Sequence, residues 1–455
     1  MGFLKKHIYA VLLIVASFVL IWQNISNSKW RENQIIRSDV AIYYTYLPAT
    51  FIYGNPLFEG EVEQDSKFRI HTSPTGRNAV KMSMGVAMLE TPFFLGGHLY
   101  ALLDSRYEAD GFSSPYHLSI SLSSVFFTIF GLIFLGLFLK KRFSKTVTLL
   151  TLFFIAFGTN LYHYTVNETG MAHPPTFFLV AALLLLTDRW ILDKKIWKSL
   201  LIGLVFGMIV LIRPINILFC VPFLFFLKQP EDLWKVHLQR LFLPLSHIVL
   251  IIVGAFLIML PQLLFWKVQT GGFMYYSYRD EGFFWTNPHI WEGLFSFRKG
   301  WLLYTPMMFL ALLGLIPLYK TNKEYFIGIV VFIVPFLYIT FSWWCWWYGG
   351  GFGARTLIDI LPFMAIPLAA LLTWLLKNKV RMSLVLIPFF FVYLNNFQTW
   401  QYFKGYIHYD SMTKEGYKKI WWMTHTPEGY WELLQRPDYE NAKLKGVEEE
   451  FVSVE

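Results

Sequence analysis

Charged residues are scarce in this sequence. Only 15% of its 455 residues are Asp, Glu, Lys or Arg, whereas 55% are hydrophobic and 19% are aromatic. A water-soluble chain of this length carries more charge on its surface, so the composition excludes a soluble protein and predicts an integral membrane protein. Only helices and closed barrels satisfy every backbone polar group in hydrocarbon, and the long unbroken apolar runs favour helices.

The chain has only two cysteines, and its sequence has no visible internal repeat. Cys220 and Cys345 both lie in apolar or aromatic surroundings, which excludes a disulfide framework and a zinc ribbon. Without a visible repeat, an inverted-repeat transporter has no positive support. The formal net charge is +9, but the basic residues form short clusters between apolar runs instead of one continuous face. Membrane topology explains that pattern, and we expect no nucleic-acid partner.

The basic clusters set the predicted topology. The first span, Ile8 to Trp22, follows Lys5 and Lys6 and lacks a small-residue cleavage site, which predicts an uncleaved signal anchor with a cytoplasmic N-terminus. Placing the other clusters in the cytoplasm as well gives about eleven spans and an outward C-terminus. The remaining predicted spans are 116–139, 147–163, 174–188, 199–212, 214–227, 242–266, 301–319, 326–341, 357–376 and 382–397.

The predicted fold is therefore an all-α polytopic membrane protein. Residues 1–397 form its transmembrane module, which includes an outward loop at 23–115. Within that loop, Met82 to Leu103 is apolar enough for a span, but a span there would invert every later loop, so we expect an interfacial or re-entrant helix. Residues 398–455 form an aromatic-rich tail that folds back over the outer face, and Glu448 to Glu450 are expected to be a solvated end.

The first outward loop begins with an acidic residue close to the membrane. Ser38 or Asp39 can cap a helix, and the tyrosines after them, Tyr43 and Tyr44 among them, recur at helical spacing. A simple N-cap is the structural alternative to any chemical role for Asp39. Arg213 lies between two short spans that join at Arg213-Pro214 and could form one broken or re-entrant unit. An arginine at depth is costly and usually faces a polar cavity.

The chain resembles the GT-C superfamily of polytopic glycosyltransferases, including the protein O-mannosyltransferases and the aminoarabinose transferases of lipid A. The resemblance rests on Asp39 directly after the first span, with Tyr43 and Tyr44 following it. It extends to segments that are similar in poorly characterised bacterial members: Ala109–Tyr116, Ser296–Trp301 with Tyr304–Pro306, Gly351–Asp359 with Leu361–Pro362, Gln398–Tyr402 and His408–Thr413.

The resemblance implies a sugar donor carried on a polyprenyl phosphate and Asp39 as the general base. A leaving phosphate needs a cation at the outer interface, where a guanidinium grips phosphate oxygens as a fork. Arg355, Arg298 and Lys299 qualify, because each lies at the outward end of a predicted span, and Arg213 is a further candidate. Snorkelling or an ion pair, for Arg355 with Asp359, is the alternative.

Two other outward loops carry candidate residues. Related enzymes commonly have a second acidic residue where Glu168 stands, and His173 could join Glu168 at a divalent cation, although two ligands do not define a metal site. Asp280 and Glu281 lie in a tyrosine-rich stretch that suits a sugar or acceptor pocket, since sugars stack on aromatic rings and hydrogen-bond to carboxylates. An interfacial aromatic belt has the same composition.

The leading hypothesis is an inverting glycosyltransferase that moves a sugar from a polyprenyl-phosphate donor to a glycan, lipid or protein acceptor. It would act on the periplasmic side of a bacterial inner membrane, with the lipid bilayer as its setting and no cofactor required beyond a possible divalent cation. A transporter or flippase of lipid-linked sugars is the alternative, and a non-catalytic assembly factor is a second one. A transporter predicts polar residues at mid-bilayer on several spans, whereas most ionisable groups here lie at span ends and in outer loops.

Overall fold

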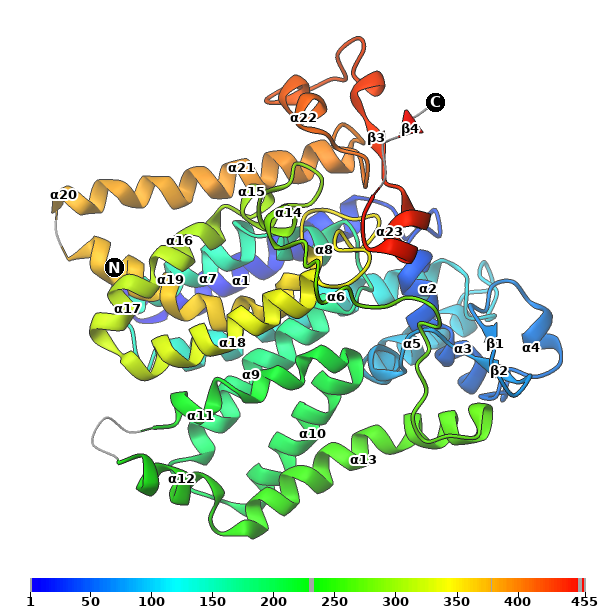
Figure 1. The fold of residues 1–455 in the computed structure, drawn as a ribbon, viewed down its shortest axis with the longest axis horizontal. Coiled ribbons are helices and arrows are strands. Elements are labelled where there is room, and N and C mark those ends of the chain that lie inside the picture. The colour runs from blue at the N-terminus through cyan, green and yellow to red at the C-terminus, as the bar shows by residue number, and fades with distance from the viewer. Residues whose placement is uncertain (1, 229–232, 378, 449–451, 454–455) are drawn as a thin grey trace. The chain divides into compact units, whose positions relative to one another are not determined.

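A computed structural model describes residues 2–228, 233–377, 379–448 and 452–453 of the chain. For residues 2–12, 379, 380, 452 and 453 it describes the backbone alone. The orienting side chains Lys5 and Lys6 are therefore outside it, as are Glu449 and Glu450. Helices dominate the described part, as predicted (Figure 1). Its strands are two short antiparallel pairs: β1 (His71–Thr72) with β2 (Asn78–Ala79), and β3 (Gln435–Arg436) with β4 (Val452–Ser453).

The contacts within the chain define two compact units. Unit 1 comprises Met1–Phe134, Tyr164–Ile217 and Gln229–Arg279, and unit 2 comprises Leu135–His163, Leu218–Lys228 and Asp280–Glu455. The boundary predicted between residues 397 and 398 falls inside helix α21 (Leu386–Phe403), and both sides of it belong to unit 2.

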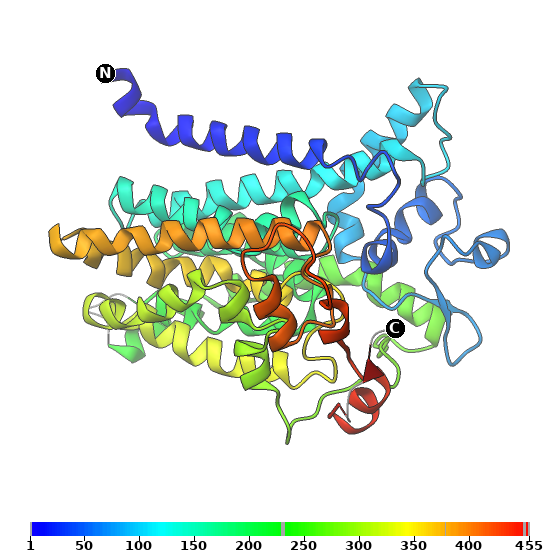
Figure 2. The same ribbon diagram turned by 90° about the horizontal axis from the view of Figure 1, so that it is seen from above.

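Unit 1 contains most of the N-terminal helices. They are α1 (Gly2–Ser26), α2 (Ser38–Tyr44), α3 (Tyr46–Phe51), α4 (Glu61–Gln64), α5 (Gly85–Leu103), α6 (Ser114–Leu139), α8 (Leu161–Val166), α9 (His173–Trp190), α10 (Ile196–Ile212), α12 (Trp234–Phe242) and α13 (Leu245–Thr270). Helix α6 ends, and α8 begins, in residues of unit 2. The blue α1 lies alongside the cyan α6 (Figure 2), where Asn24 and Ser121 are hydrogen-bonded to each other.

The closest helix packing in unit 1 is between α10 and α13 (Figure 1). A Cβ atom on Gly203 would lie only 2.2 Å from the carbonyl oxygen of Ile251, so the two backbones touch where a side chain is missing. Small residues at such crossings are typical of helices that pack in a membrane, because close backbone approach replaces the hydrophobic effect as the source of attraction.

Unit 2 contains the remaining elements: α7 (Lys145–Phe157), α11 (Phe223–Phe226), α14 (Ile290–Phe295), α15 (Trp301–Tyr304), α16 (Met307–Leu313), α17 (Leu315–Thr321), α18 (Lys323–Phe341), η2 (Arg355–Ile360), α19 (Leu361–Leu376), α20 (Lys379–Met382), η3 (Ser383–Val385), α21, α22 (Lys414–Ile420), η4 (Trp431–Leu433) and α23 (Tyr439–Lys445). Helix η1 (Pro214–Cys220) begins in unit 1 and ends in unit 2. At the centre of unit 2, α19 contacts α7, α16, α17 and α18. Its sequence is apolar on every side, as expected of a helix surrounded by protein.

Helical structure occupies every predicted span, and the protein is a multi-pass membrane protein. Five described helices are long and apolar enough to cross a membrane: Gly85–Leu103, Ser114–Leu139, Leu245–Thr270, Lys323–Phe341 and Arg355–Leu376. The predicted span 301–319 is divided into α15, α16 and α17, and Pro306 lies at the first break, where its ring nitrogen cannot donate a helical hydrogen bond.

The segment Met82–Leu103 differs from its predicted re-entrant form. Helix α5 runs through it without a turn, from Gly85 to Leu103, and Pro92 does not interrupt it. By length and composition α5 is one of the five helices that could cross a membrane. The interfacial alternative stays a prediction, and the orientation of the later loops depends on it.

The predicted break at Arg213-Pro214 is confirmed. Helix α10 ends at Ile212, Arg213 is extended, and the apolar stretch after it forms the 3-10 helix η1 and the four-residue helix α11 instead of a full span. Proline explains the break, since it disfavours helical geometry in the residue before it.

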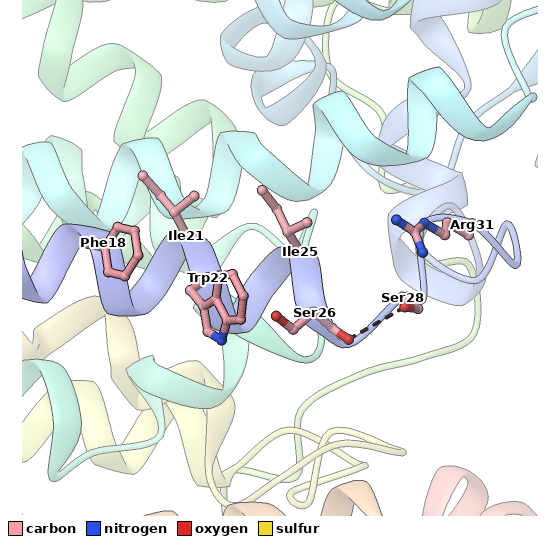
Figure 3. Close-up of a pocket in the computed structure, with 7 residues that line it drawn as sticks. All are labelled: Phe18, Ile21, Trp22, Ile25, Ser26, Ser28 and Arg31. Carbon is pink, nitrogen blue, oxygen red and sulfur yellow. Dashed lines mark hydrogen bonds between the residues drawn. The ribbon is translucent and has the colours of Figure 1, made fainter.

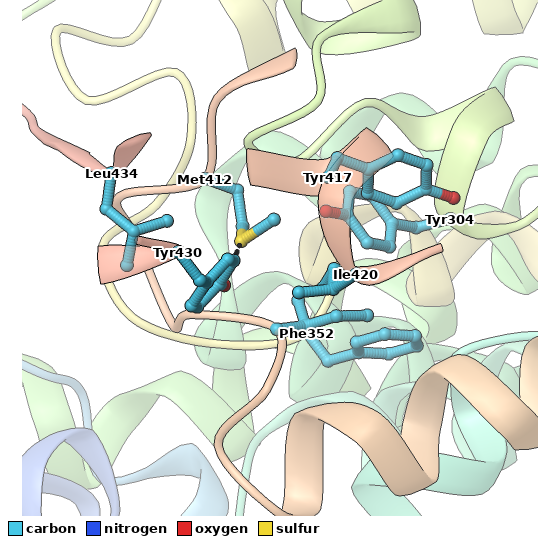
Figure 4. Packing of buried hydrophobic residues seen from close by; sticks show 8 residues of the cluster. Tyr304, Phe352, Met412, Tyr417, Ile420, Tyr430 and Leu434 are labelled. Atoms are coloured by element: carbon cyan, nitrogen blue, oxygen red, sulfur yellow. Dashed lines mark hydrogen bonds between the residues drawn. The ribbon is translucent and has the colours of Figure 1, made fainter. Parts of the chain in front are cut away.

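The aromatic tail is folded, as the sequence indicates. Met412, Tyr417, Ile420, Tyr430 and Leu434 are buried together with Tyr304 and Phe352 from earlier in unit 2 (Figure 4). The Tyr430 hydroxyl group donates to the sulfur of Met412 over 3.2 Å. Because the cluster includes residues from both sides of position 398, the tail and the helices before it share one core.

Candidate functional site

Asp39 lies at the start of a short helix that is held to the rest of unit 1. The backbone amides of Ile35 and Ile36 both donate to Nδ1 of His117, over 3.1 and 3.0 Å. The next turn begins at Ser38, whose φ of +48° is rare for a residue with a side chain. These hydrogen bonds fix the approach to α2 and leave Asp39 partly exposed in its first turn.

The predicted capping role is wrong for Ser38 and Asp39. Arg37 is the N-cap residue of α2, and no side chain accepts a capping hydrogen bond there. Asp39 instead lies inside the first turn, where unpaired backbone amides favour a negative charge.

The loop that carries Glu168 packs against this helix. Gly170, two residues after Glu168, has φ +78°, and a Cβ atom there would lie 2.7 Å from Cγ1 of Val40, the residue after Asp39. The amide of Gly170 also donates to Oγ of Ser124 over 2.8 Å. Glycine is required both by the backbone angle and by the lack of space, so the two acidic residues lie on segments in direct contact.

A buried polar network joins that loop to the end of α1. Asn24 donates through Nδ2 to the carbonyl oxygen of Thr165 over 3.0 Å and accepts at Oδ1 from Ser121. Thr169 donates to the same Ser121 hydroxyl group over 3.0 Å. Buried polar groups that are mutually satisfied specify a single arrangement, so this network holds the Glu168 loop in place.

Lys29 is a functional candidate that the sequence analysis missed. Its Nζ atom donates to the carbonyl oxygen of Asn167 over 3.1 Å. Burial lowers the pKa of Lys29, and the negative charge of Glu168 partly offsets this. The available sequence signal was its place directly after the first span, in the same short stretch as Asp39. Unit 1 thus brings a cation to the loop that carries the second acidic residue.

Glu90 is a second residue that the sequence analysis missed. It is fully buried in the apolar helix α5, and Oε1 accepts a hydrogen bond of 3.1 Å from Ser123 of α6. Its other oxygen, Oε2, has no hydrogen-bond partner among the described residues. An acidic residue within an apolar helix is itself the sequence signal, because carboxylates in such segments usually have a function.

The other predicted residues of unit 1 are Tyr43, Tyr44, His173 and Arg213. Tyr43 and Tyr44 are both buried, and the Tyr44 hydroxyl group donates to the carbonyl oxygen of Gly111. Burial raises the pKa of Tyr44 well above its ordinary value, with the nearby charges adding to the effect, so the hydroxyl group stays protonated. His173 begins α9, buried beside Tyr164 with 5.6 Å between the ring centroids. Arg213 is partly exposed at the end of α10.

The predicted cations of unit 2 all have contacts within the chain. Arg298 donates to the carboxylate of Glu448, over 2.8 Å to Oε2, so Glu448 is not the solvated residue that the sequence suggested. Lys299 is buried and donates to the carbonyl oxygens of Gly351 and Tyr409. Arg355 is partly exposed and donates from Nη2 to the carbonyl oxygen of Tyr348 over 2.8 Å.

The two predicted acids of unit 2 also bind neighbouring side chains. Asp280 forms an ion pair of 2.6 Å with Lys443, and Glu281 accepts from the indole nitrogen of Trp344 over 3.1 Å. Both acids therefore bind residues of unit 2 that lie later in the sequence.

The described residues do not provide a full metal-ligand set. Among the described residues, no group of three or more His, Cys, Asp or Glu side chains is arranged to hold a metal ion. Glu168 and His173 alone would leave most coordination positions of a divalent cation to water. The metal site stays a prediction, and no step below depends on it.

An apolar groove of about 460 Å³ runs along α1 in unit 1 (Figure 3). Phe18, Ile21, Trp22 and Ile25 line it, and Ser26, Ser28 and Arg31 form its polar end. The rings of Phe18 and Trp22 are stacked, with centroids 6.4 Å apart, and both side chains are largely exposed. The groove leads from the apolar part of the helix towards the segment that carries Lys29.

No family model matches the chain, and no curated protein matches it either. Among solved structures, the chain is similar to the oligosaccharyltransferase of Archaeoglobus fulgidus, determined with a tethered acceptor peptide that contains the NVT sequon. The TM-score is 0.54 at 13% sequence identity, and the match covers 98% of this chain and 60% of that one. The chain thus spans about three fifths of that enzyme's length.

A likeness at this identity concerns the fold. It defines the chain as an all-α, multi-pass membrane protein with an oligosaccharyltransferase-like fold, which confirms the predicted fold class. It also agrees, at the level of the fold, with the resemblance carried by the sequence motifs.

Proposed function

We propose that this protein is an inverting glycosyltransferase that transfers a sugar from a polyprenyl-phosphate donor to an acceptor on the periplasmic side of a bacterial inner membrane. The observation that carries the proposal is the contact between Gly170 and Val40, which brings the segments of Glu168 and Asp39 together within an oligosaccharyltransferase-like fold. Such a transfer needs a base near the acceptor hydroxyl group, and Asp39 is the proposed base.

In the proposed reaction, an acceptor hydroxyl group attacks the anomeric carbon of the donor sugar from the face opposite the phosphate. The new carbon–oxygen bond forms as the bond to the phosphate oxygen breaks, so the configuration inverts and polyprenyl phosphate leaves with the bonding electrons. Asp39 accepts the hydroxyl proton. Much of its contribution is to orient the acceptor for in-line attack.

Glu168 and Lys29 support this reaction from the neighbouring loop. Lys29 lies close enough to Glu168 for their charges to interact, and this favours the ionised form of the carboxylate. We propose that Glu168 binds a hydroxyl group of the sugar or the acceptor. Tyr43 and Tyr44 then maintain the position of the helix that carries Asp39.

The donor also needs sites for its lipid and its phosphate. The groove along α1 has an apolar wall for a prenyl chain and Arg31 at its polar end. Arg355 and Arg213 are partly exposed and are the preferred phosphate ligands among the predicted cations, because Arg298 and Lys299 are buried in contacts of their own. Asp280 and Glu281 remain proposed sugar or acceptor ligands.

Transfer by the reconstituted protein tests the proposal. The full chain in lipid vesicles is supplied with polyprenyl-phosphate-linked sugars and with glycan, lipid and peptide acceptors, and the released polyprenyl phosphate is measured. We expect Asp39→Asn to lower turnover by at least about 100-fold while donor binding is retained. Glu63→Gln, which neutralises an exposed acid in the same outward loop, is the matched control.

Two results would contradict the proposed glycosyltransferase mechanism. Equal turnover by Asp39→Asn and the wild type would remove Asp39 from the mechanism. Movement of intact donor across the vesicle bilayer without any transfer would instead support the alternative, a transporter or flippase of lipid-linked sugars.

A further inference from the structure

Unit 2 contains a cleft of about 510 Å³, and Arg298, Glu448 and Met412 are among the residues that line it. One side is formed by α14 and the turn that follows it, and the other by the start of α22 and strand β3. Its volume is in the range of ligand-binding pockets. Its lining includes Trp291, Glu292, Phe295, Lys414, Glu415 and Gln435.

An aromatic platform forms one wall of this cleft. Trp291 and Phe295 lie one turn apart on α14, with ring centroids 4.5 Å apart. The two residues are 70% and 40% exposed, so the paired rings are accessible from outside the protein. A flat apolar surface of this kind offers a stacking face to a ring with its own apolar face.

The floor of the cleft is rigid. Arg298, paired with Glu448, lies with its guanidinium carbon 5.9 Å from the ring centroid of Trp346. His289 stacks on the same Trp346 ring and is hydrogen-bonded through Nε2 to the carbonyl oxygen of Gly446 over 2.8 Å. These contacts exist without a ligand, so little order would have to be created on binding.

The rim of the cleft is polar and of mixed charge. Glu292 and Glu415 are exposed carboxylates, Lys414 is an exposed ammonium group, and Gln435 supplies an amide. Hydrogen-bond donors and acceptors therefore surround the aromatic platform. A sugar ring needs both, because it has a face of C–H groups and an edge of hydroxyl groups that donate and accept.

We propose that this cleft binds an oligosaccharide chain, with one ring stacked on Trp291 and Phe295 and its hydroxyl groups hydrogen-bonded to Glu292 and Glu415. An anionic lipid surface fits less well, because both carboxylates would face it. The biological role of this binding site rests on the proposed function. In a glycosyltransferase, the oligosaccharide bound here belongs to a glycan acceptor and extends away from the transferred sugar.

Binding of soluble oligosaccharides to the full chain in detergent tests this proposal without any donor. Maltohexaose and chitohexaose serve as the probes, and isothermal titration calorimetry measures the affinity. We expect at least one probe to bind, and we expect Trp291→Ala to weaken it at least tenfold. The double variant Glu292→Gln/Glu415→Gln should weaken binding while leaving the aromatic platform intact.

Trp431→Ala is the matched control, since Trp431 is a half-exposed tryptophan of the same unit that does not line the cleft. It should bind the probe as the wild type does. Absence of binding for both probes, or equal binding by Trp291→Ala and the wild type, would overturn the proposal. So would binding to a peptide or to anionic vesicles that depends on Trp291 while neither oligosaccharide binds.

The outcome is independent of the test of catalysis. Asp39→Asn should bind the oligosaccharide with unchanged affinity, whereas Trp291→Ala should raise the acceptor KM and leave turnover at saturating acceptor unchanged. If transfer is not observed but Trp291-dependent binding is, the proposed reaction fails and the binding site stands.

Discussion

Arg298 and Glu448 form a buried ion pair across 150 residues of sequence. The Nη1 atom of Arg298 donates to both carboxylate oxygens, and the side chains are only 8% and 14% exposed. The guanidinium carbon also lies 5.1 Å from the ring centroid of Trp347. A residue expected to bind phosphate and a residue expected to be solvated thus stabilise each other.

We expect the loss of either partner to be costly. Arg298→Met or Glu448→Gln leaves an uncompensated group in a mostly buried position, which should lower the free energy of unfolding by about 3 kcal/mol. The double variant should lose much less than the sum, because neither charge is then left alone. Thermal unfolding in detergent measures all four proteins, and strictly additive losses would contradict the pairing.

The contact between Gly170 and Val40 can be tested by adding one methyl group. Gly170→Ala combines a left-handed backbone angle with a clash against Val40 and should lower both stability and transfer activity, with a stability loss of about 2–4 kcal/mol. Gly54 has a similar positive φ of +58°, but nothing lies within 4 Å of its Cβ position. Gly54→Ala therefore reports the backbone strain alone.

The difference between these two glycine variants isolates the packing contribution. Gly54→Ala and Gly170→Ala are compared by their losses of thermal stability and transfer activity. Equal losses for the two variants would show that the contact between the Glu168 loop and α2 contributes to neither.

Lys29 should set an alkaline limit on activity. Burial lowers its pKa, so this lysine loses its charge at a lower pH than an exposed lysine does, although Glu168 partly opposes the shift. We expect transfer to decline as the pH rises towards the ordinary lysine pKa of about 10.4. The pH profile of transfer is the measurement.

Substitutions separate the charge of Lys29 from its bulk. Lys29→Met should reduce turnover by about tenfold and remove the alkaline decline, and Lys29→Arg should restore activity across that range because guanidinium stays protonated. Lys404→Met removes an exposed lysine and is the control. An unchanged alkaline limb in Lys29→Met would assign the titration to another group.

Asp410 should make the folded tail sensitive to acid. Burial raises the pKa of this carboxyl group. Hydrogen bonds from His408, Ser411 and Tyr439 together lower it by more, so the pKa of Asp410 is below its ordinary value. The carboxylate therefore stabilises the fold above the unfolded-state pKa of about 3.9, and this contribution is lost as the pH falls below it.

The variant Asp410→Asn should be less stable at neutral pH and should lose less stability than the wild type between about pH 5 and pH 3. Thermal unfolding across that range is the measurement. Parallel stability curves for the two proteins would show that Asp410 does not contribute to the acid sensitivity.

Much of the helical framework could be predicted because it depends on local composition. The stretch 116–139 is rich in apolar residues and has no Asp, Glu, Lys or Arg, and α6 occupies Ser114–Leu139. Arg213-Pro214 predicted a break that the structure has, because proline acts on its immediate neighbours. A helix at Met82–Leu103 was predicted as interfacial or re-entrant, and the choice against a span depended on the assumed side of every later loop.

The candidate site was only partly predictable. Asp39 and Glu168 were chosen from the family resemblance and their positions after apolar spans, but the contact between their segments depends on Gly170 and on a network from Asn24 to Ser121. Lys29 and Glu90 were missed because a single charge has no periodic pattern, and its neighbours in space are far away in sequence.

The sequence by itself determined that this is a helical membrane protein, because the hydrophobic effect and the cost of unpaired backbone groups in hydrocarbon act on every segment independently of its partners. Only the tertiary structure decided which ionisable residues are engaged with each other. Arg298 and Glu448, or Lys29 and the Glu168 loop, meet through packing between distant segments, and electrostatic interactions depend on those distances and on burial.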